Sequence, residues 1–97
     1  MARVVLAARV RDDFDRVFDF LFEKAPHAAA SHVSTIIAAV DVLQSSPLIG
    51  RPVLHGQREL VISAGASGYV ALYRYDASTD TVRVLAVRAQ RERGFRR

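Results

Sequence analysis

The spacing of hydrophobic residues changes near the middle of this 97-residue chain, and that change strongly limits the possible folds. Up to residue 43 the apolar residues recur at steps of three and four, which places them along one side of a helix. From residue 58 onward they form short runs rich in β-branched and aromatic residues, as strands do. The chain therefore pairs a mainly helical first half with a second half of strands.

Two amphipathic helices are predicted in the first half, after a short strand over residues 3–7. Pro26 ends the first helix and is well placed to begin the second, which stops near Pro47 and Gly50. The apolar stripe of the first helix is Val10, Phe14, Val17, Phe18, Leu21 and Phe22, and its polar side is Asp12, Asp13, Asp15, Arg16 and Asp19. The second stripe is Ala29, Val33, Ile36, Ile37, Val40 and Leu43. The short connection between the helices predicts an antiparallel helix hairpin.

Three strands are predicted in the second half, at "RELVIS", "GYVALYRYD" and "TVRVLAVR", with turn signals between them. Consecutive strands with short connections form an antiparallel meander. The expected fold is therefore α+β, in the order β-α-α-β-β-β, with the helix hairpin packed on an antiparallel sheet.

Length and composition predict one domain over residues 1–97, because a second core would be too small to be stable. The chain has no cysteine, which removes disulfides and thiolate chemistry and suits a cytoplasmic protein. No segment approaches the roughly 18 consecutive apolar residues of a membrane span. We therefore expect no contact with a membrane.

Positive charge is concentrated in the second half. Residues 1–47 contain five basic and six acidic side chains, whereas residues 48–97 contain nine basic and four acidic ones. Arg58, Arg74 and Arg88 belong to the predicted strands, and Arg91 and Arg93 follow the last one. Such an excess indicates a surface for phosphate or for an acidic protein, the alternative being dispersed arginines that keep the chain soluble.

Other kinds of site receive little support from the residues. His27 and His32 are five residues apart, so a helix does not direct both toward one metal ion, and we expect surface histidines and no metal. The serines lack a nucleophile elbow, and the glycines of "SAGASG" are typical of a hairpin rather than a phosphate-binding loop. No cofactor is expected.

Several segments in order resemble the RelE/ParE superfamily of bacterial type II toxin–antitoxin toxins. They are "SPLIGRPV", "RELVIS", "GYVALYRYD" and "VRVLAVRAQRERGF". The resemblance implies a growth-inhibiting toxin, neutralised by a cognate antitoxin in a hetero-oligomer. It further implies that the target is messenger RNA on the ribosome for RelE-like members, or DNA gyrase for ParE-like members.

The resemblance also assigns residues. Target binding is expected of Arg58, Arg74, Arg88, Arg91, Arg93 and Phe95, and the catalytic candidates, if the protein is a nuclease, are Arg58, Arg74, Arg88 and Glu92. The antitoxin is expected to contact Phe14, Phe18, Phe20, Tyr69 and Tyr73.

Two departures from the pattern "R-H-Q-R-E-x-G-Y" favour a ParE-like toxin. The histidine position is Ala89 and the tyrosine position is Phe95, and neither side chain can transfer a proton. Arginine, which stays protonated and so cannot act as a base, supplies only phosphate stabilisation. The alternatives are a weak RelE-like ribonuclease that uses Glu92 or a tyrosine, and a nucleic-acid-binding module with no toxicity.

Overall fold

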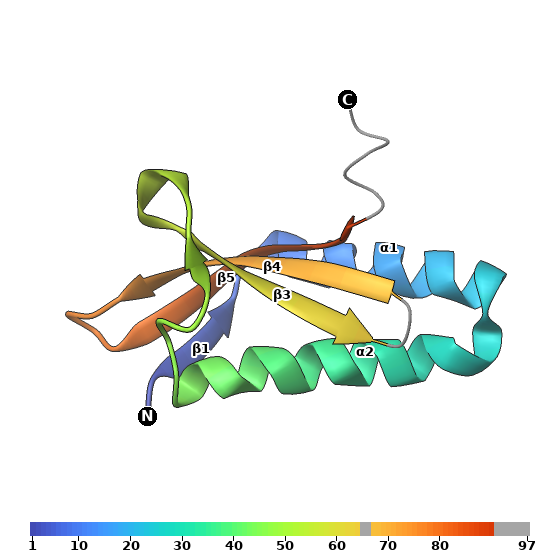
Figure 1. Cartoon of the computed structure of the whole chain (residues 1–97), viewed down its shortest axis with the longest axis horizontal. Helices are drawn as coiled ribbons and strands as arrows, with labels where there is room; N and C mark the ends of the chain where they lie inside the picture. The colour runs from blue at the N-terminus through green and yellow to red at the C-terminus, as the bar shows by residue number, and fades with distance from the viewer. Residues whose placement is uncertain (65–66, 91–97) are drawn as a thin grey trace.

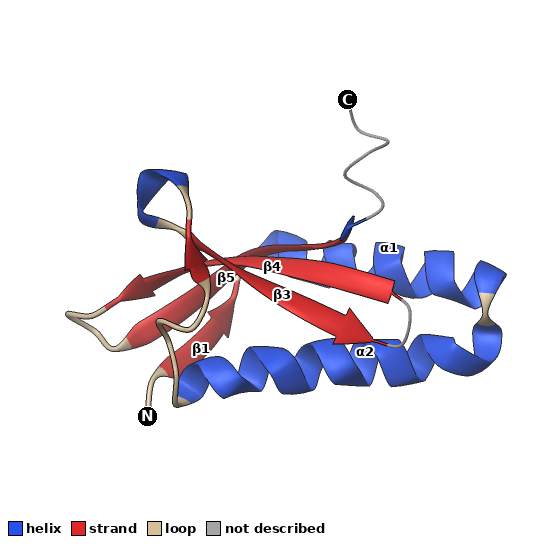
Figure 2. Ribbon diagram, in the orientation of Figure 1, coloured by secondary structure: helices blue, strands red, loops and turns tan. Residues whose placement is uncertain are grey.

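The computed structural model describes residues 1–64 and 67–90. Its main elements are β1 (Arg3–Leu6), α1 (Ala8–Lys24), α2 (Pro26–Asp41), β2 (Arg51–Pro52), β3 (Arg58–Ala64), β4 (Ser67–Asp76) and β5 (Thr81–Ala89). Two short 3-10 turns, Val42–Gln44 and Leu54–Gly56, follow α2 and β2. The predicted α+β fold and the order of its elements are confirmed, with the two-residue strand β2 as an addition (Figure 2).

The strands form one sheet in the order β1-β5-β4-β3-β2. Strands β3, β4 and β5 make the predicted antiparallel meander. Strand β1 lies beside the last strand and runs parallel to it, from the pair Arg3 and Thr81 to the pair Leu6 and Val84. The first described strand of the chain is therefore an edge strand of the sheet, and its neighbour is the last described strand.

Both helices lie on the same face of this sheet (Figure 1). Helix α1 packs mainly against β5 and helix α2 against β3, and the two helices contact each other along their length. The core lies between the layers. It includes aliphatic side chains from both helices, Ile62 of β3, Tyr69 and Tyr73 of β4, and Val82, Val84 and Val87 of β5. No described helix is long and apolar enough to cross a lipid bilayer.

A β-bulge in β5 explains how Val84 and Val87 both reach the core. Tyr73 pairs with Val84 whereas its neighbour Leu72 pairs with Ala86, so Leu85 is an extra residue on β5. In a regular strand two residues three apart face opposite sides of the sheet. The bulge shifts this alternation by one residue, and both valines are therefore fully buried on the helix side.

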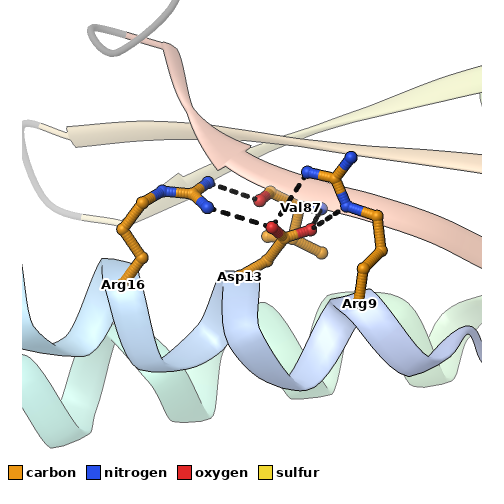
Figure 3. A network of polar contacts seen from close by, with 4 residues as sticks. All are labelled: Arg9, Asp13, Arg16 and Val87. Carbon is orange, nitrogen blue, oxygen red and sulfur yellow. Dashed lines mark hydrogen bonds and ion pairs between the residues drawn. The ribbon is translucent and has the colours of Figure 1, made fainter.

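Beyond the bulge, the free edge of β5 is bound by side chains of α1 rather than by a strand (Figure 3). Asp13 Oδ2 accepts a 2.9 Å hydrogen bond from the amide of Val87, and Arg16 Nη2 donates to the carbonyl of Val87 at 3.3 Å. Arg9 and Arg16 both donate to the Asp13 carboxylate, at 3.0 to 3.3 Å. The Asp13 carboxylate and the Arg16 guanidinium thus form hydrogen bonds with the backbone amide and carbonyl of Val87. Strand β1 does not reach these two groups because it ends at Leu6.

The placement of Asp13 corrects the predicted polar side of the first helix. Its side chain is buried between α1 and β5, and the buried residues of α1 are Val10, Asp13, Val17 and Leu21. Phe18 and Phe22, assigned to the apolar stripe, are instead exposed and stack on each other with ring centroids 5.9 Å apart. The charged network compensates for the burial of the Asp13 carboxylate.

Stability should fall when Asp13 is protonated. Burial raises the pKa of Asp13, but hydrogen bonds from Arg9, the Val87 amide and Arg16 outweigh it, so the pKa lies below its ordinary value. A carboxylate with a depressed folded pKa contributes stability above its unfolded pKa of about 3.9, and this is lost as the pH falls through the folded value. We expect the urea midpoint to decrease below about pH 4. Asp13→Asn should show a weaker dependence in that range, and an unchanged pH profile would contradict this expectation.

Candidate functional site

The sheet face opposite the helices presents Arg74 and Arg88, two of the three strand arginines that the sequence singles out. Strand pairing places three groups of side chains on this surface, which we call the open face. They are Glu59 and Val61 of β3, Val70, Leu72 and Arg74 of β4, and Arg83, Ala86 and Arg88 of β5. Neither helix covers this face, and Val61 is 54% exposed.

Glu59 connects two arginines on the open face. Its carboxylate accepts a 2.8 Å hydrogen bond from Arg51 Nη2 of β2 and lies 3.6 Å from Arg88 Nη2 of β5. The Glu59 side chain is 13% exposed, whereas that of Arg51 is 70% exposed. The carboxylate therefore holds Arg88 in position and leaves Arg51 accessible.

Arg58 lies on the other side of the sheet and has a structural role. It pairs with Tyr73, whose side chain faces the helices, and its Nη1 donates to the carbonyls of Leu48 and Gly50 at 3.1 and 2.8 Å. These bonds fix the loop before β2. The sheet therefore does not gather Arg58, Arg74 and Arg88 on one face.

Arg74 and Arg88 share the open face but lie near opposite ends of β4. Arg74 pairs with Arg83 near the β4–β5 turn, whereas Arg88 pairs with Val70. Leu72, Leu85 and Ala86 lie between them and are half-buried. The arginines thus form two separate positive positions with a neutral surface between them.

Groups suited to proton transfer are few on this face. Within residues 1–64 and 67–90, the histidines lie on α2 and in the 3-10 turn after β2, and none lies in a strand. Glu59 is engaged in ion pairs. The predicted residues Arg91, Glu92, Arg93 and Phe95 lie outside the described part of the chain.

Tyr69 and Tyr73, which are expected to contact an antitoxin, are both buried on the helix side and not accessible at the surface. The hydroxyl of Tyr69 forms a 2.9 Å hydrogen bond with Nδ1 of His32 on α2. This histidine, predicted to lie at the surface, is half-buried and links α2 to the sheet.

Tyr73 fixes the loop that leads to β2. Its hydroxyl donates to the carbonyl of Pro47 and accepts from the amide of Gly50, both at 2.8 Å. A Cβ at position 50 would lie 2.6 Å from that hydroxyl, so only glycine fits there. The sequence marks Gly50 as a helix breaker but does not reveal this close approach.

The three phenylalanines that are expected to contact the antitoxin, Phe14, Phe18 and Phe20, lie on α1. Phe18 and Phe20 are 37% and 38% exposed, and the Lys24 ammonium lies 5.7 Å from the centre of the Phe20 ring. Phe14 is half-buried and lines two adjoining cavities of about 590 and 180 Å³ at the free edge of β1. We call these cavities the β1 groove; their apolar lining includes Val4, Leu6, Ala7, Ala8, Phe14, Ile37 and Val40.

The family of the chain follows from comparison with known sequences. A family model described as "ParE toxin of type II toxin-antitoxin system, parDE" matches residues 4–94. The chain belongs to this family. It is therefore a toxin of the RelE/ParE superfamily, as the resemblance predicts.

Two curated relatives come from Caulobacter vibrioides. The toxin is 33% identical to "Toxin RelE3" over 93 residues, which are 96% of this chain and 99% of that protein. It is 39% identical to "Toxin RelE1" over 71 residues, 73% of this chain and 76% of that protein. The relatives thus have RelE names, whereas the matching family model is of ParE type.

Solved structures confirm the fold of the toxin. It superposes on a chain of the chromosomal ParDE toxin–antitoxin system from P. aeruginosa with a TM-score of 0.76 and 22% identity, covering 92% of this chain and 96% of that one. Superposition on a chain of the intact E. coli RelBE complex gives a TM-score of 0.59 at 14% identity, covering 90% and 94%.

Proposed function

We propose that this toxin inhibits growth in the ParE manner, by binding DNA gyrase, rather than by cutting messenger RNA. Two features of the open face support this proposal. Neutral side chains separate Arg74 from Arg88, and the carboxylate of Glu59 is paired with Arg51 and Arg88. Cleavage of RNA requires groups that accept and donate protons, and their loss costs about 10²- to 10⁴-fold in rate. Binding has no such requirement. The family model, which is of ParE type, supports the same conclusion.

A cognate antitoxin is the second part of the proposal. We infer that it covers the outer side of α1 and the β1 groove, in contact with Phe14, Phe18 and Phe20. Exposed aromatic rings beside an apolar groove are the kind of surface that a protein partner buries. The similar solved structures are of toxin–antitoxin complexes. This toxin would accordingly be held in a cytoplasmic hetero-oligomer until the antitoxin is removed.

Induction in cells distinguishes the two targets. A gyrase-binding toxin should trigger DNA-damage signalling and filamentation while ribosome-bound transcripts stay intact. The measurement is primer extension on those transcripts within minutes of induction, together with a DNA-damage reporter. Co-expression of the antitoxin should abolish both effects and is the control.

The outcome that contradicts gyrase binding is equally specific. Codon-dependent cuts that appear before any DNA-damage signal would assign the toxin to the messenger RNA nucleases, as the RelE names of its relatives suggest. In that case Arg74, Arg88 and Glu92 would be the residues to test for catalysis.

A further inference from the structure

Two arginines face each other at the end of the open face that is next to the β4–β5 turn. Arg74 and Arg83 are direct cross-strand partners, and both are exposed. Like charges directly opposite each other destabilise an antiparallel pair of strands. This arrangement therefore costs stability unless a negatively charged group lies between the two guanidinium groups.

No such group is supplied by the described part of the chain. Neither Arg74 nor Arg83 forms an ion pair within 4.0 Å of a carboxylate in residues 1–64 and 67–90. The contrast with Arg51 and Arg88 is direct, because those two arginines share Glu59 on the same face.

A carboxylate of β4, Asp76, forms hydrogen bonds within the turn. Its Oδ1 accepts hydrogen bonds from the amide and the hydroxyl of Ser78, at 3.0 and 2.6 Å. These bonds, the hydroxyl first, lower the pKa of Asp76. Asp80, in the same turn, accepts a 2.7 Å hydrogen bond from the hydroxyl of Tyr75. Both carboxylates thus form hydrogen bonds within the turn, and neither forms an ion pair with Arg74 or Arg83 in the described part of the chain.

Both arginines line a small cavity beside the β4–β5 turn. It has a volume of about 120 Å³ and is lined by Arg74, Asp76, Thr79, Thr81 and Arg83. The hydroxyl of Thr81 donates to the carbonyl of Thr79, so it is not free to donate to a ligand. The arginines are therefore the donors of this cavity, which we call the hairpin site.

A third arginine lies on the adjacent strand. Arg3 of β1 pairs with Thr81 of β5, and residues paired across strands project from the same face of the sheet. Arg3 is exposed. Three neighbouring strands thus contribute the positive charges of Arg3, Arg83 and Arg74 to this end of the open face. The cavity lining contains one carboxylate, that of Asp76, so the local charge is positive.

We propose that the hairpin site binds the phosphate group of a phosphate ester. Guanidinium groups are planar forks that bind phosphate oxygens in pairs, and the cavity has the size of one small anion. A phosphate ester offers tetrahedrally arranged free oxygens, three in a monoester and two in a diester, and these match two arginine forks better than the planar carboxylate does. The site stands on residues of β4 and β5 and does not depend on gyrase being the target.

Binding to the purified full chain tests this assignment. Inorganic phosphate and AMP, added at constant ionic strength, should give saturable shifts of the Arg74 and Arg83 Nε–Hε signals in NMR spectra, whereas acetate should not. Arg74→Gln and Arg83→Gln should each weaken AMP binding by roughly tenfold, the effect of losing one charge-assisted contact. Arg11→Gln, at an exposed position of α1 in the helix layer, is the matched control and should leave the affinity unchanged.

A single-stranded oligonucleotide separates the two sources of such a phosphate. Binding that is tighter than that of AMP, with a salt dependence whose slope falls by about 0.7 in each arginine variant, would assign the site to a nucleic-acid backbone. Equal affinity for the two would assign it to a free phosphate ester. Absence of shifts, equal shifts with acetate, or an equal loss of affinity in Arg11→Gln would overturn the proposal.

Discussion

Replacement of Asp13 by alanine is expected to lower the free energy of unfolding by about 3 to 5 kcal/mol, the usual cost of removing one partner from a buried ion pair. The change leaves the amide of Val87 without its acceptor and Arg9 and Arg16 without their shared carboxylate. Small domains have total stabilities of about 5 to 15 kcal/mol, so a large part of the fold's margin would disappear. Urea unfolding followed by circular dichroism measures the loss.

Two variants make this test specific. Asp12→Ala removes an exposed carboxylate from the preceding position and should change stability by no more than about 0.5 kcal/mol. Asp13→Asn keeps an oxygen that can accept from Val87 but removes the charge, so its effect should lie between the other two. If Asp13→Ala and Asp12→Ala unfold at the same urea concentration, the network has no role in stability.

The double variant Arg88→Gln with Arg91→Gln is expected to abolish growth inhibition while leaving the fold intact. Arg88 is held on the open face by Glu59, so its loss removes a positioned charge from the proposed target-binding surface. Loss of two charge-assisted contacts should weaken target binding by about 10²-fold or more. Glutamine is preferable to glutamate at position 88, because a second carboxylate beside Glu59 would disturb β3.

The matched control removes the same charge from the helix layer. Arg11→Gln with Lys24→Gln alters two exposed positions of α1 and should leave the toxin as inhibitory as the wild type. Colony counts after induction, with circular dichroism as the test of folding, decide the matter. A folded Arg88 and Arg91 variant that still arrests growth would show that these arginines only keep the chain soluble.

The sequence predicts the elements of the fold well because their signals are local. Steps of three and four residues mark the helices, Pro26 separates them, and alternating β-branched residues mark β3, β4 and β5. The place of β1 beside β5 is not predictable in this way, since the pairing of Arg3 with Thr81 joins distant parts of the chain. Its parallel direction has no local signal either.

The candidate site is harder to predict because side-chain direction depends on register. Arg58 shares its strand face with Leu60, which is half-buried, and Ile62, which is buried. Because every second residue of a strand lies on the same face, this apolar pair is a signal that Arg58 faces the helices. The burial of Asp13 has no such signal, since it depends on the bulge at Leu85 and on an amide of β5. The role of Arg83 has no local signal in the sequence, because it depends on the strand register that places Arg83 opposite Arg74.

The position of β5 between β1 and β4 has a consequence for biosynthesis. The helix hairpin leaves the ribosome before β5, the strand that binds both β1 and α1, because β5 follows the other described strands and helices in the sequence. Contacts between distant segments slow folding, so the nascent chain stays incomplete until β5 has emerged. A chain that stops before Thr81 therefore lacks β5, the strand that pairs with both β1 and β4. The sheet of this toxin is therefore complete only after β5 has been translated.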